Sequence, residues 1–171
     1  MREFSVLTLR MSTRVFPFTE EDKDSALEKA RRVVAYYAER WKTAGKRLGF
    51  DTKFQTQLWY VGFCAENAIA RILNGQVDEG ESYGTEWDVD IPELGHVQIK
   101  TTQAYGLNPF PVKQPRNVFP NPEGLVWLTY YRDSDIQNVR ELTWSEVFKF
   151  PKEGQFFQVQ IPTEYWNRVD K

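Results

Sequence analysis

Two short segments on either side of a predicted turn carry side chains that could do chemistry together. Asp88 and Asp90 alternate with apolar residues before the turn at 92–95, and Gln98 and Lys100 alternate with apolar residues after it. This period of two predicts an antiparallel β-hairpin, and we expect its register to place Asp90 opposite Gln98 and Asp88 opposite Lys100. Carboxylate and carbonyl oxygens are ligands for Mg²⁺ or Mn²⁺, and a neighbouring lysine can position a water molecule or stabilise charge on a phosphate. The pattern favours a metal-assisted hydrolytic site over its alternative, an ordinary solvated face with a cross-strand ion pair.

A helix and the apolar side of the hairpin must position these groups. The expected strands, 87–91 and 96–101, turn four apolar side chains to the side opposite the polar ones: Val89, Ile91, Val97 and Ile99. Apolar residues at three- and four-residue steps predict a helix over 56–73, which we expect to pack on that apolar side. Glu66 lies in this helix among small and apolar neighbours and has no cation three or four residues later. We therefore include Glu66 in the candidate site, with a surface glutamate as the alternative.

The three elements together resemble the core of the PD-(D/E)xK nuclease superfamily. The motif runs from Asp88 through Val89-Asp90-Ile91 to Gln98-Ile99-Lys100, with Glu66 on the preceding helix. The usual acidic residue of the second strand is replaced by Gln98, as in Mrr-like restriction endonucleases. The resemblance covers about residues 56–131.

This resemblance implies a function and a set of roles. It implies a Mg²⁺- or Mn²⁺-dependent nuclease that hydrolyses phosphodiester bonds in DNA, as an endonuclease rather than an exonuclease. The catalytic residues would be Asp88, Gln98, Lys100 and Glu66, with Lys100 orienting the attacking hydroxide. The metal ligands would be Asp88, Gln98 and Glu66, with Asp90 and the backbone carbonyl of Ile99 as further candidates. His96 lies at the turn, and we interpret it as a polar turn residue.

The remaining elements indicate an α/β (α+β) protein with a restriction-endonuclease-like mixed central β-sheet flanked by helices. We expect one or two strands in 4–18, a helix capped by Thr19 and running to Gly45, and a central strand over 125–131. A capping box predicts a short helix from Thr143, followed by a strand over 156–161 and a short terminal helix. Five prolines argue against any regular element in 103–122. We assign residues 1–171 to a single domain, in which 1–55 form an N-terminal strand and helix extension and 56–131 the motif-bearing core.

The charge distribution supports a polyanionic partner. The formal net charge is −2, yet 23–53 carry nine Lys or Arg against four acids, and 78–93 carry seven acids and no Lys or Arg. A basic segment beside an acidic one suits a protein that binds both a polyanion and a cation. Aromatic and basic residues also interleave in 103–122. The candidate DNA-binding residues are Arg31, Arg32, Arg40, Lys42, Lys46, Arg47, Lys113 and Arg116.

Composition excludes several other classes of protein. No apolar run approaches the length of a membrane span, the N-terminus does not resemble a signal peptide, and the single cysteine, Cys64, precludes an internal disulfide. We expect a cytoplasmic protein without a membrane partner, and a homodimer remains open. Two alternative functions also remain: a catalytically inactive nucleic-acid-binding or partner-binding module on the same fold, and a protein-interaction domain. The replacement by Gln98 keeps the first of these in consideration.

Overall fold

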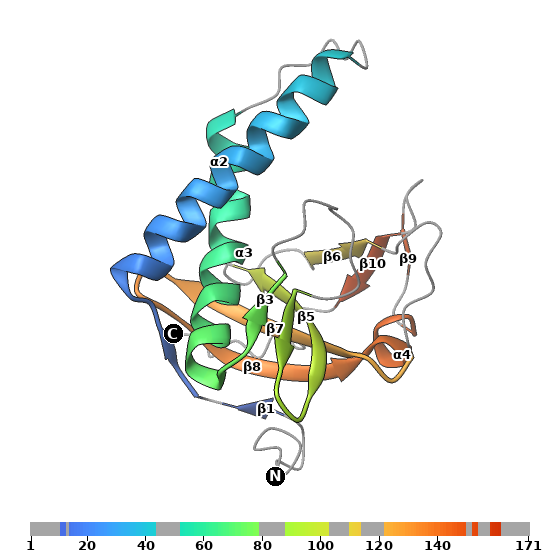
Figure 1. Ribbon diagram of the computed structural model, residues 1–171. Helices are drawn as coiled ribbons and strands as arrows, with labels where there is room; N and C mark the ends of the chain where they lie inside the picture. Colours follow the sequence, from blue (N-terminus) through green and yellow to red (C-terminus); the bar gives the residue numbers. More distant parts are fainter. Residues whose placement is uncertain are drawn as a thin grey trace.

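The computed structural model of the chain describes residues 11–12, 14–43, 52–78, 88–102, 110–113, 122–149, 152–153 and 158–161. Helices and a mixed sheet dominate these ranges (Figure 1). In chain order the elements are β1 (Met11–Ser12), β2 (Phe16–Pro17), α2 (Glu20–Thr43), α3 (Thr52–Leu73), β3 (Gln76–Val77), β4 (Val89–Ile91), β5 (Gly95–Thr102), β6 (Phe110–Lys113), β7 (Leu125–Arg132), β8 (Asp135–Thr143), α4 (Trp144–Val147), β9 (Lys152–Glu153) and β10 (Gln158–Ile161).

The larger sheet contains seven strands and is mixed. Its order is β1-β8-β7-β5-β4-β3, and β2 also pairs with β8. β5 and β7 are parallel, whereas the other pairs are antiparallel. β6, β10 and β9 form a second, three-stranded antiparallel sheet. The predicted α/β class with a mixed sheet is therefore confirmed, and the N-terminal strands belong to the same sheet as the hairpin.

Hydrophobic clusters cover both faces of the sheet at β7. Leu125 and Trp127 belong to the cluster shared with α2 and α3, while Val126 and Leu128 pack with Trp144 near α4 on the other face. All residues of β7 except the last are buried. Burial on both faces is typical of a central strand, as predicted for 125–131.

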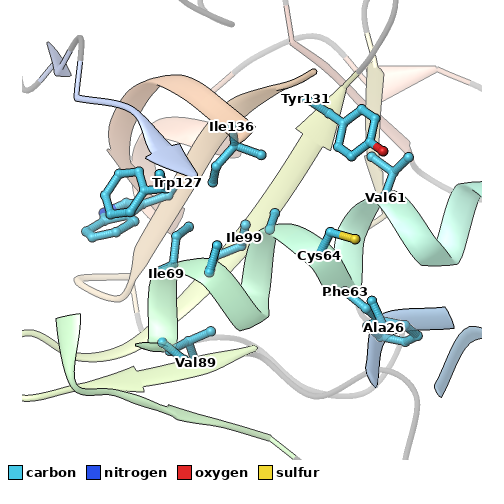
Figure 2. Close-up of a cluster of buried hydrophobic side chains, with 14 of the residues drawn as sticks. Ala26, Val61, Phe63, Cys64, Ile69, Val89, Ile99, Trp127, Tyr131 and Ile136 are labelled. Atoms are coloured by element: carbon cyan, nitrogen blue, oxygen red, sulfur yellow. The ribbon is translucent and has the colours of Figure 1, made fainter. Parts of the chain in front are cut away.

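Helix α3 packs against the apolar side of the β4–β5 hairpin, as predicted. Val89, Ile91, Val97 and Ile99 are at most 5% exposed. They share a cluster with the small residues of α3, whose short side chains let the helix approach the sheet, and Figure 2 shows Ile69 of α3 beside Val89 and Ile99. The helix begins at Thr52, four residues earlier than predicted.

The register of the hairpin differs from the predicted one by two residues. Val89 pairs with Val97 and Asp90 with His96, so that Asp88 comes opposite Gln98 instead of Lys100. The connection is shorter than expected because β5 already begins at Gly95, which has a positive φ of 80°. A shift by two residues preserves which side chains share a face, so the polar set stays together although its partners change.

The α2 helix starts where predicted and is fastened to α3. The Asp22 backbone N–H donates to Thr19 Oγ1, and the Thr19 backbone N–H donates to Asp22 Oδ2, both at 3.0 Å. Arg71 of α3 forms an ion pair with Asp22 at 2.9 Å, and the Asn67 side chain donates to the Asp22 carbonyl. Beyond these contacts, the later half of α2 and the first turns of α3 project past the sheet (Figure 1).

The end of α3 approaches the hairpin closely at Gly75. The Gly75 N–H donates to the Ala70 carbonyl, which closes the helix. A β-carbon at Gly75 would lie 2.8 Å from the carbonyl oxygen of Asp90. Only glycine fits here without displacing the strand that carries Asp88 and Asp90.

Strands β6 and β8 depart most from the sequence-based expectations, and the two-residue strands β3 and β9 were not predicted either. β8 was not predicted, because its apolar residues Ile136, Val139 and Leu142 recur every three positions. A register shift opposite Leu128–Tyr130 and a positive φ at Asn138 disturb the alternation there. β6 lies within the proline-rich stretch, and it tolerates Pro111 because it is an edge strand of its sheet.

The sequence also predicted where three helices begin or end. The capping box of Thr143 and Glu146 at the start of α4 is confirmed. The predicted helix end at Gly45 and the terminal helix after Pro162 lie outside the described residues.

Candidate functional site

Asp88 is held rigidly at the entry to β4. Its Oδ2 accepts hydrogen bonds from Gln98 Nε2 and from the backbone N–H of Ile99, both at 2.7 Å. Its own N–H donates to the Val97 carbonyl, and its carbonyl accepts from the Asp78 N–H. Side chain and backbone of Asp88 are thus both fixed by neighbouring segments, and the structure brings Asp88 and Gln98 together.

Glu66 is a buried carboxylate on α3. Its side chain is only 8% exposed, and among the described residues no donor lies within hydrogen-bond distance of it. Burial raises the pKa of Glu66 well above its ordinary value, and the charge of Asp88 raises it further. A buried carboxylate without a partner is costly, and such a group is typical of a site that takes up a cation.

The positive charges of Lys29 and Lys100 partly offset the repulsion between the carboxylates of Glu66 and Asp88. Burial raises the pKa of Asp88 too, whereas Lys100, the Ile99 N–H and Lys29 lower it. Lys29 and Lys100 also lower the pKa of Glu66. Lys100 lies on β5, two residues after Gln98 and on the same face. All four predicted catalytic residues therefore belong to one cluster.

Lys29 and Asp78 join this cluster, although sequence reasoning did not single them out. Lys29 of α2 donates from Nζ to the Asp78 carbonyl at 3.0 Å, and its ammonium lies 4.6 Å from the centre of the Phe63 ring. The charge of Asp78 raises the pKa of both Glu66 and Asp88. Lys29 and Asp78 are 49 residues apart, so no local pattern could have connected them.

The donor set fits a divalent cation with several water ligands. The described residues contain no group of three or more His, Cys, Asp or Glu placed to hold a metal ion. Glu66 and Asp88 supply two carboxylates, and the Gln98 Oε1 accepts no hydrogen bond from described residues. Mg²⁺ often binds through one or two carboxylates and keeps several waters, so this sparse set is adequate. The coordination by the Ile99 carbonyl stays a prediction.

Asp90 lies apart from the buried cluster. Its Oδ1 is 3.9 Å from His96 Nε2, and the two side chains are 46% and 59% exposed. It occupies the open end of the hairpin near the turn. Asp90 is therefore the weaker candidate for a metal ligand.

Three of the predicted DNA-binding residues can be placed on α2. Arg31, Arg32 and Arg40 are exposed on this helix. Arg32 forms a weak ion pair with Glu28 at 3.8 Å, and the Arg40 guanidinium stacks over the Tyr36 ring at 4.3 Å. The remaining candidates have side chains outside the described part of the chain: Lys42, Lys46, Arg47, Lys113 and Arg116.

Comparison with known proteins identifies no relative. The chain matches no protein-family model, no curated protein and no solved structure. None of the helices in the described ranges combines the length and hydrophobicity needed to cross a membrane.

Proposed function

We propose that this protein is a Mg²⁺- or Mn²⁺-dependent nuclease of the PD-(D/E)xK type, with a restriction-endonuclease-like fold, that hydrolyses phosphodiester bonds in DNA. The observation that carries the proposal is the buried Glu66, which has no hydrogen-bond donor among the described residues and whose pKa is raised by the charge of Asp88, with Lys100 on the same hairpin face as Gln98. Stability alone gives no reason to bury two mutually repelling carboxylates. Perturbed carboxyl pKa values of this kind cluster at functional sites.

The side chains divide the chemistry among them. A bound divalent cation would polarise the scissile phosphate and favour hydroxide over water. Glu66 and Asp88 would hold the cation, and Gln98 and the Ile99 N–H fix the orientation of Asp88. Lys100 orients the attacking water and stabilises negative charge as it develops on the phosphate.

The exposed arginines of α2 support DNA as the substrate. Arg31, Arg32 and Arg40 lie on an element that projects from the sheet, where a duplex can reach them (Figure 1). Phosphate contacts of this kind give affinity without sequence preference. Endonucleolytic cleavage and a cytoplasmic location are further parts of the proposal.

Gln98 favours a second candidate function, a DNA-binding or partner-binding module without catalysis. Its amide donates to Asp88 where an acidic residue would repel that carboxylate. The site therefore has one negative charge fewer, and its affinity for a cation is correspondingly lower.

Cleavage assays with matched aspartate variants test the proposal. We expect the wild-type chain to nick supercoiled plasmid with Mg²⁺ or Mn²⁺ and to be inactive with EDTA. Asp88→Asn should reduce the rate at saturating Mn²⁺ by at least about a hundredfold, as for an essential electrostatic group. Lys100→Ala should abolish cleavage with little change in melting temperature.

Asp90→Asn is the matched control, since it makes the same change two residues away at the exposed end of the hairpin. It should lose much less activity than Asp88→Asn. Wild-type cleavage by Lys100→Ala, or a reversed order of the two aspartate variants, would show that the site is wrongly assigned. Metal-dependent DNA binding without any nicking would support the non-catalytic module.

A further inference from the structure

Lys29 pairs with no carboxylate of the described residues, although Glu66, Asp88 and Asp78 belong to the same cluster. Among the described residues, no acid is within ion-pair distance of its ammonium group. Its contacts are instead the Asp78 carbonyl, at 3.0 Å from Nζ, and the face of Phe63, at 4.6 Å. An ammonium group has three N–H donors, and the Asp78 carbonyl uses one of them. No carboxylate of the described residues therefore forms an adjacent ion pair with Lys29.

The position of Lys29 is set by an aromatic stack between α2 and α3. Tyr37 stacks on Trp59 at 6.0 Å, and Trp59 stacks on Phe63 at 5.6 Å. Phe63 is buried and precedes Glu66 by one helical turn. Because Trp59 stacks on Phe63, the ring of Phe63 holds the Lys29 ammonium group in place one helical turn before Glu66 on α3.

The charges of the cluster become complementary to a phosphate only when a cation is bound. Three carboxylates, those of Glu66, Asp88 and Asp78, act on the site together with the ammonium groups of Lys29 and Lys100. With all three carboxylates ionised, the described charges leave one negative charge in excess, which repels a phosphodiester. A divalent cation reverses that excess, and both lysines then attract the phosphate group.

We propose that Lys29 is a second phosphate-binding lysine of the site, which acts with Lys100 on the scissile phosphate from the side of α2. This inference rests on the proposed function. Lys29 reaches the site from the helix whose exposed arginines are proposed to bind the duplex. The same element would thus contact both the flanking phosphates and the one that is cleaved.

This role predicts opposite effects on the two ligands of the site. Removing a positive charge weakens binding of a phosphate and leaves binding of a cation unchanged or stronger. A merely structural lysine, which only fixed Asp78 and β4, would instead weaken cation binding when removed. The direction of the change in Mn²⁺ affinity therefore separates the two roles.

Lys29→Met, Lys29→Arg and a control, Lys23→Met, test the proposal. Methionine keeps the apolar stem over Phe63, and arginine keeps the charge. Lys23 lies on the same helix in an ion pair with Glu20, and it is not among the main charges that shift the pKa of Glu66 or Asp88. The measurements are kcat/KM on a DNA duplex, calorimetric Mn²⁺ binding without DNA, and duplex affinity with Mn²⁺ in the uncleaving Lys100→Ala background.

We expect Lys29→Met to lower kcat/KM and duplex affinity at least about tenfold, with Mn²⁺ bound as tightly as by wild type or more tightly. Lys29→Arg should recover most of the loss, and Lys23→Met should match wild type. A Lys29→Met variant that cleaves and binds DNA like Lys23→Met, or that loses Mn²⁺ affinity, would overturn the role of Lys29. A wild-type chain that cleaves no DNA would contradict the proposed function instead, and the duplex affinities would still test Lys29.

Discussion

At the scale of single residues, Glu66 has a carboxyl group whose charged form is disfavoured in the folded chain. Its pKa is raised in the folded chain by burial and by Asp88. The folded state therefore keeps a proton at pH values where the unfolded chain has released it. This contribution to stability is fully present below the ordinary glutamate pKa, and it is lost as the pH rises toward the raised value.

Glu66→Gln should therefore stabilise the metal-free protein at neutral pH while it removes a metal ligand. We expect a gain of about 1 kcal/mol or more in the free energy of unfolding, the scale on which an uncompensated buried polar group costs stability. Urea denaturation between about pH 4 and pH 8 measures it. The gain should grow with pH.

The control for this prediction is Glu39→Gln on the exposed side of α2, which should leave the pH profile nearly unchanged. Mn²⁺ should raise the melting temperature of the wild type but not that of Glu66→Gln. A Glu66→Gln variant less stable than wild type at pH 7 would show that the carboxylate has a stabilising partner.

At the scale of elements, α2 carries out two tasks with different parts of its length. Its first turns are tied to α3 through Asp22 and Arg71, and they bring Lys29 to the hairpin. Its later turns project from the sheet (Figure 1). They carry Arg40, whose guanidinium lies over the ring of Tyr36. A rigid helix of 24 residues thus connects the candidate site with the candidate DNA-binding surface.

The arginines of α2 should set the salt dependence of DNA binding. Each phosphate contact that is lost lowers the slope of log K against log salt concentration by about 0.9 for a duplex. We expect the double variant Arg31→Gln/Arg40→Gln to lower that slope by up to roughly twice this amount, as measured by fluorescence anisotropy over a salt series. Lys149→Gln, an exposed change beyond α4, serves as the control, and an equal slope in both variants would place the binding surface elsewhere.

At the scale of the whole molecule, α3 contributes both to the candidate site, through Glu66, and to the hydrophobic core that it forms with the sheet. Cys64 lies on the buried side of α3, two residues before Glu66, and is fully inaccessible (Figure 2). Burial raises the pKa of its thiol to about 11. Its reactivity therefore reports whether α3 remains seated on the sheet.

The Cys64 thiol should be almost unreactive in the native protein. Its raised pKa leaves roughly a hundredfold less thiolate at neutral pH than an ordinary cysteine has, and burial blocks the reagent as well. Labelling with a chromogenic disulfide should modify one thiol per chain in denaturant and almost none without it. Rapid labelling of the native chain would contradict the close packing of α3 against β5.

Much of the site could be predicted from sequence because alternation along a strand is a local property. The period of two around the turn was enough to place Gln98 and Lys100 on one face and the apolar residues on the other. The helical period likewise indicated that α3 covers the apolar face and carries Glu66. Both conclusions depend only on residues that are close in sequence.

Only the tertiary structure decided which partners these residues meet. The register of the hairpin followed from the length of its turn, which brought Asp88 to Gln98 instead of Lys100. Lys29 entered the site through contacts with Asp78 and Phe63, far along the chain. Strand β8 was hidden because its bulge and its positive φ break the alternation that marks a strand. Contacts between distant segments depend on how whole elements pack, and a local pattern contains no information about that packing.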